Sequence, residues 1–398
     1  MITRSFKYSN TIIFNATNIG YKYSGLGVYA LKLLKKLAAY DHDLNFIVYL
    51  NKNAKNHIDN FTFPKNFKIK WVSSTLSPDL GFPAHLLRLI YSNYLSIKHL
   101  RYVQFNSSQL EISFFKKNQI VTIHDIIPIV FKQYHKKQSV YFKYVLKLGL
   151  FKAQKIITPS FHSKKTIAEL YKISQEKIKV IYHGINDKPS GTQNSEPIVK
   201  GKYLLYVGRI CKMKNINGLL NSFYAIRDKI EHSLVIVGDD EKKLAEEINA
   251  ISDEQEFQSR IKFLKNVTEE DKNNLMKHAS LFIFPSLYEG FGFPPLEAMA
   301  NGCPVVISNT SSLPEICEDT AIYINPNNHA QIAAEIVRVL NDEPRMKVLK
   351  EESVLRAKLF TWEHSVTEHI GLFKAALAVK QEKIAVIQNT VLASSKQL

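Results

Sequence analysis

Short apolar runs alternate with longer amphipathic stretches along both halves of the chain. The stretches repeat their apolar positions every three to four residues, as helices that cover a sheet do. Strands that alternate with such helices predict parallel sheets with crossover helices, an α/β fold. The predicted strands are 11–14, 45–50, 120–123, 155–158, 203–207, 233–237, 281–284 and 304–307, and the predicted helices are 28–40, 139–153, 217–229, 296–300 and 361–380.

A polar stretch rich in turn-forming residues, 187–197, separates the two halves. A chain of 398 residues is long enough for two domains of about 100–200 residues each. We therefore place a linker in this stretch and predict one domain over residues 1–187 and a second over residues 198–361. The last residues, 389–398, are expected to form a frayed tail.

Basic residues are concentrated in the first half. Residues 1–200 hold 30 Lys and Arg against 10 Asp and Glu, whereas the remainder holds 23 against 26. This asymmetry indicates an anionic partner for the first half: a lipid surface, nucleic acid or a phosphorylated substrate. Segment 131–155 mixes lysines with aromatic residues, which fits an anionic membrane surface or nucleic acid, or else a buried helix whose lysines extend to solvent. No named nucleic-acid-binding motif is present, so no nucleic acid is expected.

Composition excludes several classes of protein. The shares of 45% hydrophobic and 22% charged residues are ordinary for a soluble globular protein. Cys211, Cys303 and Cys317 show no Cys-x-x-Cys spacing, so neither a zinc site nor a disulfide framework is expected, and reduced thiols fit the cytoplasm. No apolar run reaches the ~18 residues of a membrane span, and the first run, 11–14, is too short for a signal-peptide core.

Residues 284–304 (FPSLYEGFGFPPLEAMANGCP) carry the densest candidate chemistry. A strand runs into a loop with Gly290 and Gly292, and a helix follows. Glycines let the backbone approach a ligand, and amides at a helix N-terminus favour an anion. Glu289 and Glu297 stand eight residues apart, and carboxylate oxygens suit sugar and ribose hydroxyls because both accept hydrogen bonds. In a purely structural interpretation, Glu297 would stabilise the helix dipole and the glycines would form a turn. This explains each residue singly but not the occurrence of all of them together.

This string resembles the Glu-x7-Glu signature of retaining GT-B glycosyltransferases of the family-4 type, which usually carry Gly-Phe-Gly-hydrophobic-Pro between the two glutamates. The resemblance extends along most of the chain. It implies two Rossmann-like domains that face each other across a cleft, with a closing helix over 362–385 that crosses back onto the first domain. By resemblance, Glu289 would position the donor sugar and Glu297 the ribose, and Gly290, Phe291 and Gly292 would line the donor site.

Further matches place a nucleotide-sugar in the second half. Gly208, Arg209 and Lys214 resemble the family's Gly-Arg-x4-Lys segment; there Arg and Lys would neutralise a diphosphate. Val267 and Thr268 resemble the segment that lines the nucleobase pocket.

Three details of the second half leave questions open. The family often has Gly where Asn215 stands, and many relatives carry Gly-x-Gly where this chain has Gly238-Asp239. The missing second glycine leaves the shape of that loop undetermined. Glu315, in a segment that resembles a stretch near the donor sugar, fits a helix-start Glu equally well.

Two segments of the first half resemble family elements that reach toward the donor. Gly25 and Gly27 match the N-terminal glycine loop, whose amides would meet the donor phosphate. His124, beside Asp125, matches the family's His-Asp element and would contact the donor sugar as a catalytic residue. Without these companions, a His beside an Asp is more often a structural pair.

The resemblance implies a retaining hexosyltransferase that uses a nucleotide-sugar, with GDP-mannose favoured over a UDP-sugar, and a lipid-linked or oligosaccharide acceptor in bacterial surface polysaccharide synthesis. We expect a cytoplasmic enzyme, peripheral on the inner face of the membrane, with no cofactor. The lone Asp41-His-Asp43 pattern lies in a polar loop, so no metal is expected, and Arg209 with Lys214 would neutralise the leaving diphosphate. The alternatives are a nucleotide-sugar epimerase or phosphorylase on the same fold, and a non-catalytic membrane-surface-binding protein.

Overall fold

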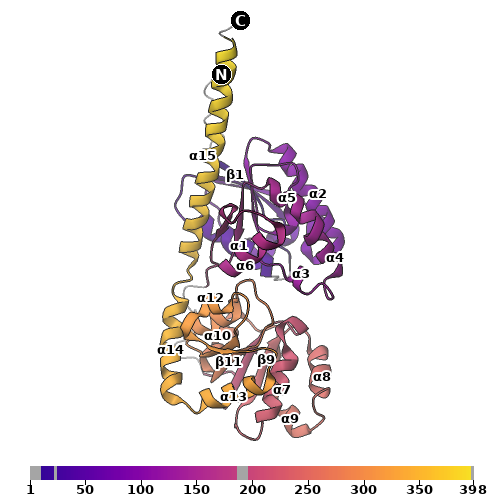
Figure 1. Cartoon of the computed structure of the whole chain (residues 1–398), viewed down its shortest axis with the longest axis vertical. Helices are drawn as coiled ribbons and strands as arrows, with labels where there is room; N and C mark the ends of the chain where they lie inside the picture. The colour runs from indigo at the N-terminus through magenta and orange to yellow at the C-terminus, as the bar shows by residue number, and fades with distance from the viewer. Residues whose placement is uncertain (1–9, 22–24, 186–195, 396–398) are drawn as a thin grey trace. The chain divides into compact units, whose positions relative to one another are not determined.

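The computed structural model describes residues 10–21, 25–185 and 196–395, with side chains described as far as residue 380. The chain divides into two compact units (Figure 1). Unit 1 comprises Met1–Pro159, Ser163–His183 and Trp362–Leu398, and unit 2 comprises Ser160–His162 and Gly184–Thr361. Most of the predicted linker, 187–197, lies outside the described residues, as does the predicted domain limit at 187, whereas the limit at 198 lies among the described residues.

Unit 1 is built on a parallel seven-stranded sheet in the order β3-β2-β1-β4-β5-β6-β7. Its central strands are buried along their whole length, as parallel strands covered on both faces must be. The strands are β1 (Thr11–Asn15), β2 (Asn45–Asn51), β3 (Phe67–Val72), β4 (Val103–Asn106), β5 (Gln119–Thr122), β6 (Lys155–Thr158) and β7 (Ile178–Val180).

The helices of unit 1 follow the expected alternation with the strands. The helix predicted over 139–153 is interrupted by a π-helical turn, Tyr141–Leu146. The helices are α1 (Gly25–Ala39), α2 (Phe82–Lys98), α3 (Ile127–Val130), α4 (Lys136–Val140), α5 (Lys147–Lys152), α6 (Phe161–Tyr171), whose first two residues count with unit 2, and α15 (Trp362–Ser395), with short 3-10 turns at Lys52–His57, Ser74–Leu76, Pro78–Leu80, Gln109–Glu111 and Gln175–Lys177.

Unit 2 repeats the plan with a parallel six-stranded sheet in the order β10-β9-β8-β11-β12-β13. Its strands are β8 (Tyr203–Val207), β9 (Ser233–Gly238), β10 (Ile261–Lys265), β11 (Leu281–Phe284), β12 (Val305–Ser308) and β13 (Ile322–Ile324). Its helices are α7 (Ile216–Ile226), α8 (Glu241–Asn249), α9 (Gln255–Ser259), α10 (Glu269–His278), α11 (Phe293–Ala300), α12 (Leu313–Cys317), α13 (His329–Leu340) and α14 (Glu343–Ala357), with 3-10 turns at Lys212–Lys214 and Glu318–Thr320. The sequence therefore predicted the two parallel-sheet units correctly.

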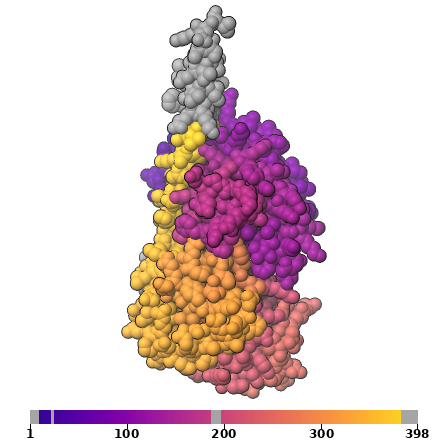
Figure 2. All heavy atoms as spheres, in the orientation of Figure 1, coloured from indigo at the N-terminus to yellow at the C-terminus, as the bar shows by residue number. Residues whose placement is uncertain are grey.

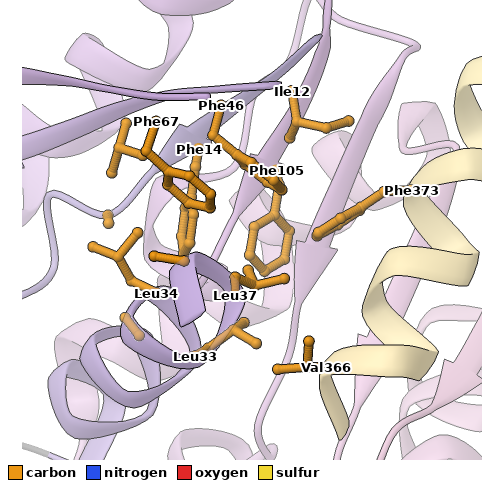
Figure 3. Packing of buried hydrophobic residues seen from close by; sticks show 14 of the residues in the cluster. Ile12, Phe14, Leu33, Leu34, Leu37, Phe46, Phe67, Phe105, Val366 and Phe373 are labelled. Atoms are coloured by element: carbon orange, nitrogen blue, oxygen red, sulfur yellow. The ribbon is translucent and has the colours of Figure 1, made fainter. Parts of the chain in front are cut away.

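The closing helix α15 packs against the sheet of unit 1, as the resemblance implied. Phe373 lies 5.1 Å from Phe105, ring centroid to ring centroid, and Val366 and Trp362 belong to the same buried cluster (Figure 3). The first part of α15 runs along the surface of unit 1 in the space-filling view (Figure 2). Burial of these apolar side chains against the strands fixes the helix to unit 1.

Two predictions about the end of the chain are wrong. The closing helix was expected to stop at residue 385 and a frayed tail to begin at 389, whereas α15 continues to Ser395. Residues 381–395 contain neither glycine nor proline, so nothing in the sequence stops the helix there. Within the described ranges, none of the helices combines the length and the apolar content that a membrane span requires.

Candidate active site

The strand order of unit 2 predicts a ligand site at one edge of its sheet. In unit 2 the chain starts at β8, adds β9 and β10 on one side, and then returns to add β11, β12 and β13 on the other. All pairs are parallel, so the carboxyl ends of β8 and β11 meet at the same edge, at the point where the strand order reverses. Open α/β sheets bind ligands at this switch point. Gly208 and Arg209 follow β8, and the glutamate–glycine loop follows β11.

The two loops at the switch point of unit 2 are hydrogen-bonded together. The carbonyl oxygen of Met213 accepts from the backbone N–H of Leu287 at 2.8 Å and from Ser286 Oγ at 3.2 Å. Asn215 ends the first loop with a left-handed φ of 55° and caps α7 by accepting from Gly218 N at 3.2 Å. Asn therefore fills this left-handed position in place of the glycine that the family often carries.

Lys214 and Glu289 form an ion pair across the switch point. The Lys214 ammonium contacts Glu289 Oε1, and their side chains are 19% and 9% exposed. The ammonium also lies 5.2 Å above the ring of Phe284, the last residue of β11. A half-buried ammonium with three N–H donors can hold this carboxylate and still donate to a phosphate oxygen. The structure thus brings together two residues that the sequence assigned to the same donor.

Two serines after β12 hold the Glu289 loop. The backbone N–H of Glu289 donates to Ser311 Oγ at 2.9 Å. Ser312 Oγ lies 3.1 Å from the carbonyl oxygen of Glu289 and 2.9 Å from that of Phe291. Ser311 itself has a left-handed φ of 59°. These bonds fix the backbone on both sides of Gly290, so that the Glu289 side chain is aimed by its loop.

The turn from this loop into α11 requires a glycine. Gly292 has a φ of 109°, and a Cβ there would come within 2.7 Å of Leu313 Cδ2. The next residues, Phe293-Pro-Pro, start the eight-residue helix α11. The Phe291 side chain is buried against the rings of Phe293 and Phe360, 5.2 and 5.8 Å away. Any part that Phe291 plays in donor binding therefore falls to its backbone.

Glu297 has an ammonium partner that the sequence did not indicate. Lys272 of α10 pairs with Glu297 at 2.9 Å and with Glu269 at 3.1 Å. Burial alone would lower the pKa of Lys272, but the two carboxylates outweigh it and the pKa lies above its ordinary value. The ammonium therefore stays charged and holds one oxygen of Glu297. The i,i+3 spacing of Glu269 and Lys272 is the only part of this network that the sequence could indicate.

The loops after β8 and β9 also pack together. Asp239 Oδ1 accepts from the backbone N–H of Ile210 at 3.1 Å, and Asp239 Oδ2 lies 3.4 Å from Arg209 Nε. A Cβ on Gly238 would lie 3.2 Å from the carbonyl oxygen of Gly208. Gly238 alone is therefore enough for the close approach of the two loops. Asp239, at the next position, accepts a hydrogen bond from the loop after β8. The Arg209 side chain is 75% exposed, so its ion pair is weak and the guanidinium can turn toward a phosphate.

Thr268 and Glu315 of unit 2 have structural partners. Thr268 is the N-cap of α10, accepting from Asp271 N at 3.0 Å, and Val267 beside it is half-buried. Glu315 accepts from the backbone N–H groups of Phe161 and His162 at 2.7 and 2.9 Å, two residues that count with unit 2. Glu315 lies in the first turn of α12, and its carboxylate also accepts from the start of α6, a contact that neither interpretation included.

In unit 1, His124 follows β5 and is buried beside Tyr29. Its Nε2 lies 3.2 Å from the carbonyl oxygen of Ser107, which follows β4, and its ring meets Tyr29 edge-on at 4.7 Å. Burial lowers the pKa of His124 to about 4, so the imidazole is neutral at neutral pH. Because a carbonyl only accepts, Nε2 carries the proton and Nδ1 is an acceptor, which suits a sugar hydroxyl.

Two further histidines complete this cluster in unit 1. His369 of α15 lies 3.0 Å from the Tyr29 hydroxyl through Nε2, and its Nδ1 lies 2.7 Å from the carbonyl oxygen of Ser365. His183 packs 4.6 Å from the Tyr29 ring and 5.4 Å from His124. Burial lowers the pKa of His369 to about 4 and that of His183 well below its ordinary value. No local pattern could have joined these residues, because they come from distant parts of the chain.

The glycine segment of unit 1 lies at the start of a helix. Gly25 and Gly27 form the first turn of α1, with Gly25 exposed and Gly27 buried. A Cβ on Gly25 would meet no atom within 4 Å. Ser24, which precedes them, lies outside the described residues.

The lone Asp-His-Asp pattern has other partners. Asp43 Oδ1 pairs with Lys374 Nζ of α15 at 2.7 Å, and His42 Nε2 lies 3.0 Å from the carbonyl oxygen of Leu37. Across the described part of the chain, no group of three or more His, Cys, Asp and Glu side chains could hold a metal ion.

Comparisons with known proteins match both halves. A family model described as "Glycosyltransferase Family 4" matches residues 23–188, and one described as "Glycosyl transferases group 1" matches residues 189–355. The chain is 28% identical over 330 residues to the O-antigen chain mannosyltransferase RfbU of Salmonella typhimurium, covering 80% of this chain and 87% of that protein. It is 27% identical over 393 residues to the O-antigen chain mannosyltransferase B of Escherichia coli, covering 91% and 99%. The solved structure of a sucrose-phosphate synthase from Thermosynechococcus elongatus superposes with a TM-score of 0.72 at 20% identity, covering 93% and 100%.

Proposed function

Because the chain belongs to the family-4 type of the group 1 glycosyltransferases, whose two models together match residues 23–355, we propose that it transfers a hexose from a nucleotide-sugar to a lipid-linked or oligosaccharide acceptor. Its two parallel-sheet units are those of the GT-B fold. Mannose from GDP-mannose is the favoured donor over a UDP-sugar, since both relatives described above are named O-antigen chain mannosyltransferases. The same names support a role in bacterial surface polysaccharide synthesis.

The observation that carries this proposal is the Lys214–Glu289 pair at the switch point of unit 2. In the proposed complex, Lys214 and Arg209 neutralise the diphosphate. Gly208, Gly290 and Gly292 let the backbone approach the donor. Glu289 accepts from a hydroxyl of the hexose, and Glu297, held by Lys272 through one oxygen, accepts from the ribose with the other. Val267 and Thr268 border the nucleobase.

The proposed reaction keeps the anomeric configuration of the donor. The bond between the anomeric carbon and the diphosphate oxygen breaks, and the acceptor hydroxyl oxygen attacks the same carbon from the same face. The acceptor proton passes to the departing phosphate oxygen, so that no protein base is required. Lys214 and Arg209 stabilise the negative charge that develops on the leaving group, the task that a metal ion performs in other transferases. We therefore propose that no metal and no cofactor take part.

Unit 1 is proposed to bind the acceptor and to contribute His124. The neutral imidazole offers Nδ1 as an acceptor for a sugar hydroxyl, and the first turn of α1, with Gly25 and Gly27, offers backbone amides to a phosphate oxygen. The excess of Lys and Arg in residues 1–200 supports an anionic lipid-linked acceptor. It also supports a cytoplasmic enzyme that is peripheral on the inner face of the membrane.

A thermal-shift screen of GDP-, UDP- and dTDP-sugars tests the donor site. At a hundredfold excess over its Kd, a bound donor should stabilise the protein by about 2.7 kcal/mol and raise the melting temperature by about 5–10 °C. The Arg209→Ala variant is expected to lose most of this shift, and the exposed control Lys242→Ala is expected to keep it. A flat response to every nucleotide-sugar would contradict the proposal, and donor consumption without an acceptor would favour an epimerase or phosphorylase.

A further inference from the structure

Helix α2 of unit 1 buries three polar side chains beside two apolar ones, Ala84 and Leu95. Arg88, Ser92 and Ser96 face the interior of unit 1 and are fully buried. Arg88 Nε pairs with Glu111 at 2.9 Å, and Ser96 Oγ donates to Gln104 at 2.8 Å. The helix is therefore anchored by an ion pair and hydrogen bonds as well as by Leu95, whereas a surface helix of a soluble domain ordinarily buries a continuous apolar stripe.

The outward face of the same helix is apolar. Ile90 is 58% exposed and Ile97 59%, and these positions recur at the three-to-four-residue spacing of one helix face. The exposed members are Phe82, Leu86, Leu87, Ile90, Tyr94 and Ile97, with Leu80 and Leu100 at the ends. An exposed run of large apolar side chains of this extent marks a surface that contacts an apolar phase or partner.

A second apolar row lies on the neighbouring helices. Val140, Tyr144, Leu148 and Phe151 are all more than half exposed and follow one another at helical spacing through α4, the π-helical turn and α5. The ammonium of Lys137 on α4 lies 5.1 Å from the ring of Phe82 at the start of α2. The start of α2 and the first turn of α4 are therefore neighbours, and we call the two apolar rows together the α2–α5 face.

Charge around the α2–α5 face has one sign. No Asp or Glu occurs from residue 80 to residue 110 or from residue 126 to residue 168, and the second of these segments holds nine lysines. Lys143 lies 5.1 Å from the ring of Tyr144 and Lys147 lies 5.9 Å from the ring of Phe151, so lysines stand directly beside the apolar row. Apolar side chains bordered by lysines fit a bilayer with anionic headgroups. A second copy of the chain would bring lysines against lysines, which opposes self-association through this face.

We propose that the α2–α5 face docks on an anionic lipid bilayer, with the outward side chains of α2 entering the boundary between headgroups and acyl chains. The lysines of α4 and α5 contact lipid phosphates, and the buried Arg88–Glu111 pair holds α2 with its apolar side outward. This surface would bring the enzyme to a lipid-linked acceptor. The biological role of the docking rests on the proposed function, whereas the docking itself does not.

Vesicle sedimentation of the full chain tests this surface. Wild type should sediment with phosphatidylcholine vesicles that contain phosphatidylglycerol, and much less with phosphatidylcholine alone. The double variant Leu86→Glu/Ile90→Glu should lower the vesicle affinity by about tenfold or more, since two inserted side chains become charged. A second variant, Lys143→Glu/Lys147→Glu, should weaken binding only to the anionic vesicles. The matched control Leu355→Glu/Leu359→Glu changes two equally exposed leucines of unit 2 and should bind as wild type does.

Several outcomes would overturn the docking proposal. Unchanged vesicle binding of Leu86→Glu/Ile90→Glu would do so, and so would a wild-type dimer that this variant converts to a monomer without lipid. The donor thermal shift is measured on the same variants and should be retained. The fluorescence of Trp71 and Trp362, which both belong to unit 1, shows that the changed unit is folded. Lost vesicle binding with a retained donor shift supports the docking surface. If the wild-type protein binds vesicles but shows no donor shift, the proposed function is refuted and the docking proposal is not.

Discussion

Replacement of Lys214 by alanine is expected to lower kcat/KM for hexose transfer by about 10²–10³-fold, the effect of removing one donor that stabilises developing charge. The ammonium is held at the switch point by Glu289 and by the ring of Phe284. Its loss removes a positive charge from the leaving diphosphate and also leaves the buried Glu289 carboxylate without its partner. Initial rates at several donor concentrations would measure the effect.

Two further variants show whether a loss of rate is specific to the Lys214–Glu289 pair. Lys242→Ala removes an exposed lysine of α8 in the same unit and should leave the rate within about twofold of wild type. Glu289→Gln keeps the size of the side chain but removes the charge, so it should lower kcat while the protein stays folded. If Lys214→Ala retained more than half of the wild-type rate, the donor would have to bind elsewhere.

Breaking the Arg88–Glu111 ion pair is expected to destabilise unit 1 by about 3–5 kcal/mol, because either single change leaves a fully buried charge uncompensated. Burial raises the pKa of Glu111 more than the neighbouring guanidinium lowers it, so this carboxylate depends on its partner to stay ionised. Both tryptophans of the chain, Trp71 and Trp362, belong to unit 1. Tryptophan fluorescence during urea unfolding therefore reports on the affected unit.

A double-mutant cycle separates the pair from simple loss of packing. Arg88→Met and Glu111→Leu should each destabilise unit 1 strongly, whereas the combined variant Arg88→Met/Glu111→Leu should destabilise it far less than the sum of the two single changes. The exposed pair Arg338–Glu335 of α13 is the control, and its removal should change the free energy of unfolding by about 0.5 kcal/mol or less. Strictly additive effects at Arg88 and Glu111 would contradict this account.

Much of the fold could be predicted because most strands are short, apolar and separated by amphipathic stretches. β8 and β11 were predicted at their observed limits. Helix α2 was not predicted, and its composition explains why: the periodic apolar positions that ordinarily mark the buried face here lie outside, and Arg88 lies inside. A method that expects the apolar face of a helix to be buried assigns the buried face of such a helix wrongly. The end of α15 was misplaced because the polar last residues resembled a tail.

The candidate site could be predicted where its residues form contiguous strings. Lys214 and Glu289 belong to local motifs, and a parallel sheet with a switch point brings such motifs to one edge. Lys272 could not be identified, because its contact to Glu297 comes from another element and leaves no local spacing. Ser312 lies in the segment that the resemblance placed near the donor sugar, but its contact to the Glu289 loop could not be predicted for the same reason. Tyr29 and His369, which share a hydrogen bond, lie 340 positions apart and illustrate the same limit.

The configuration of the transferred hexose tests the central claim most directly. Wild-type protein is incubated with GDP-α-mannose and a lipid-linked saccharide acceptor, without added divalent metal and with a chelator present, and the product is examined by NMR. We predict a glycosidic bond with the α configuration of the donor, formed at a rate that depends on the acceptor and falls sharply in Lys214→Ala. A β-linked product, or free mannose released regardless of acceptor, would contradict the account.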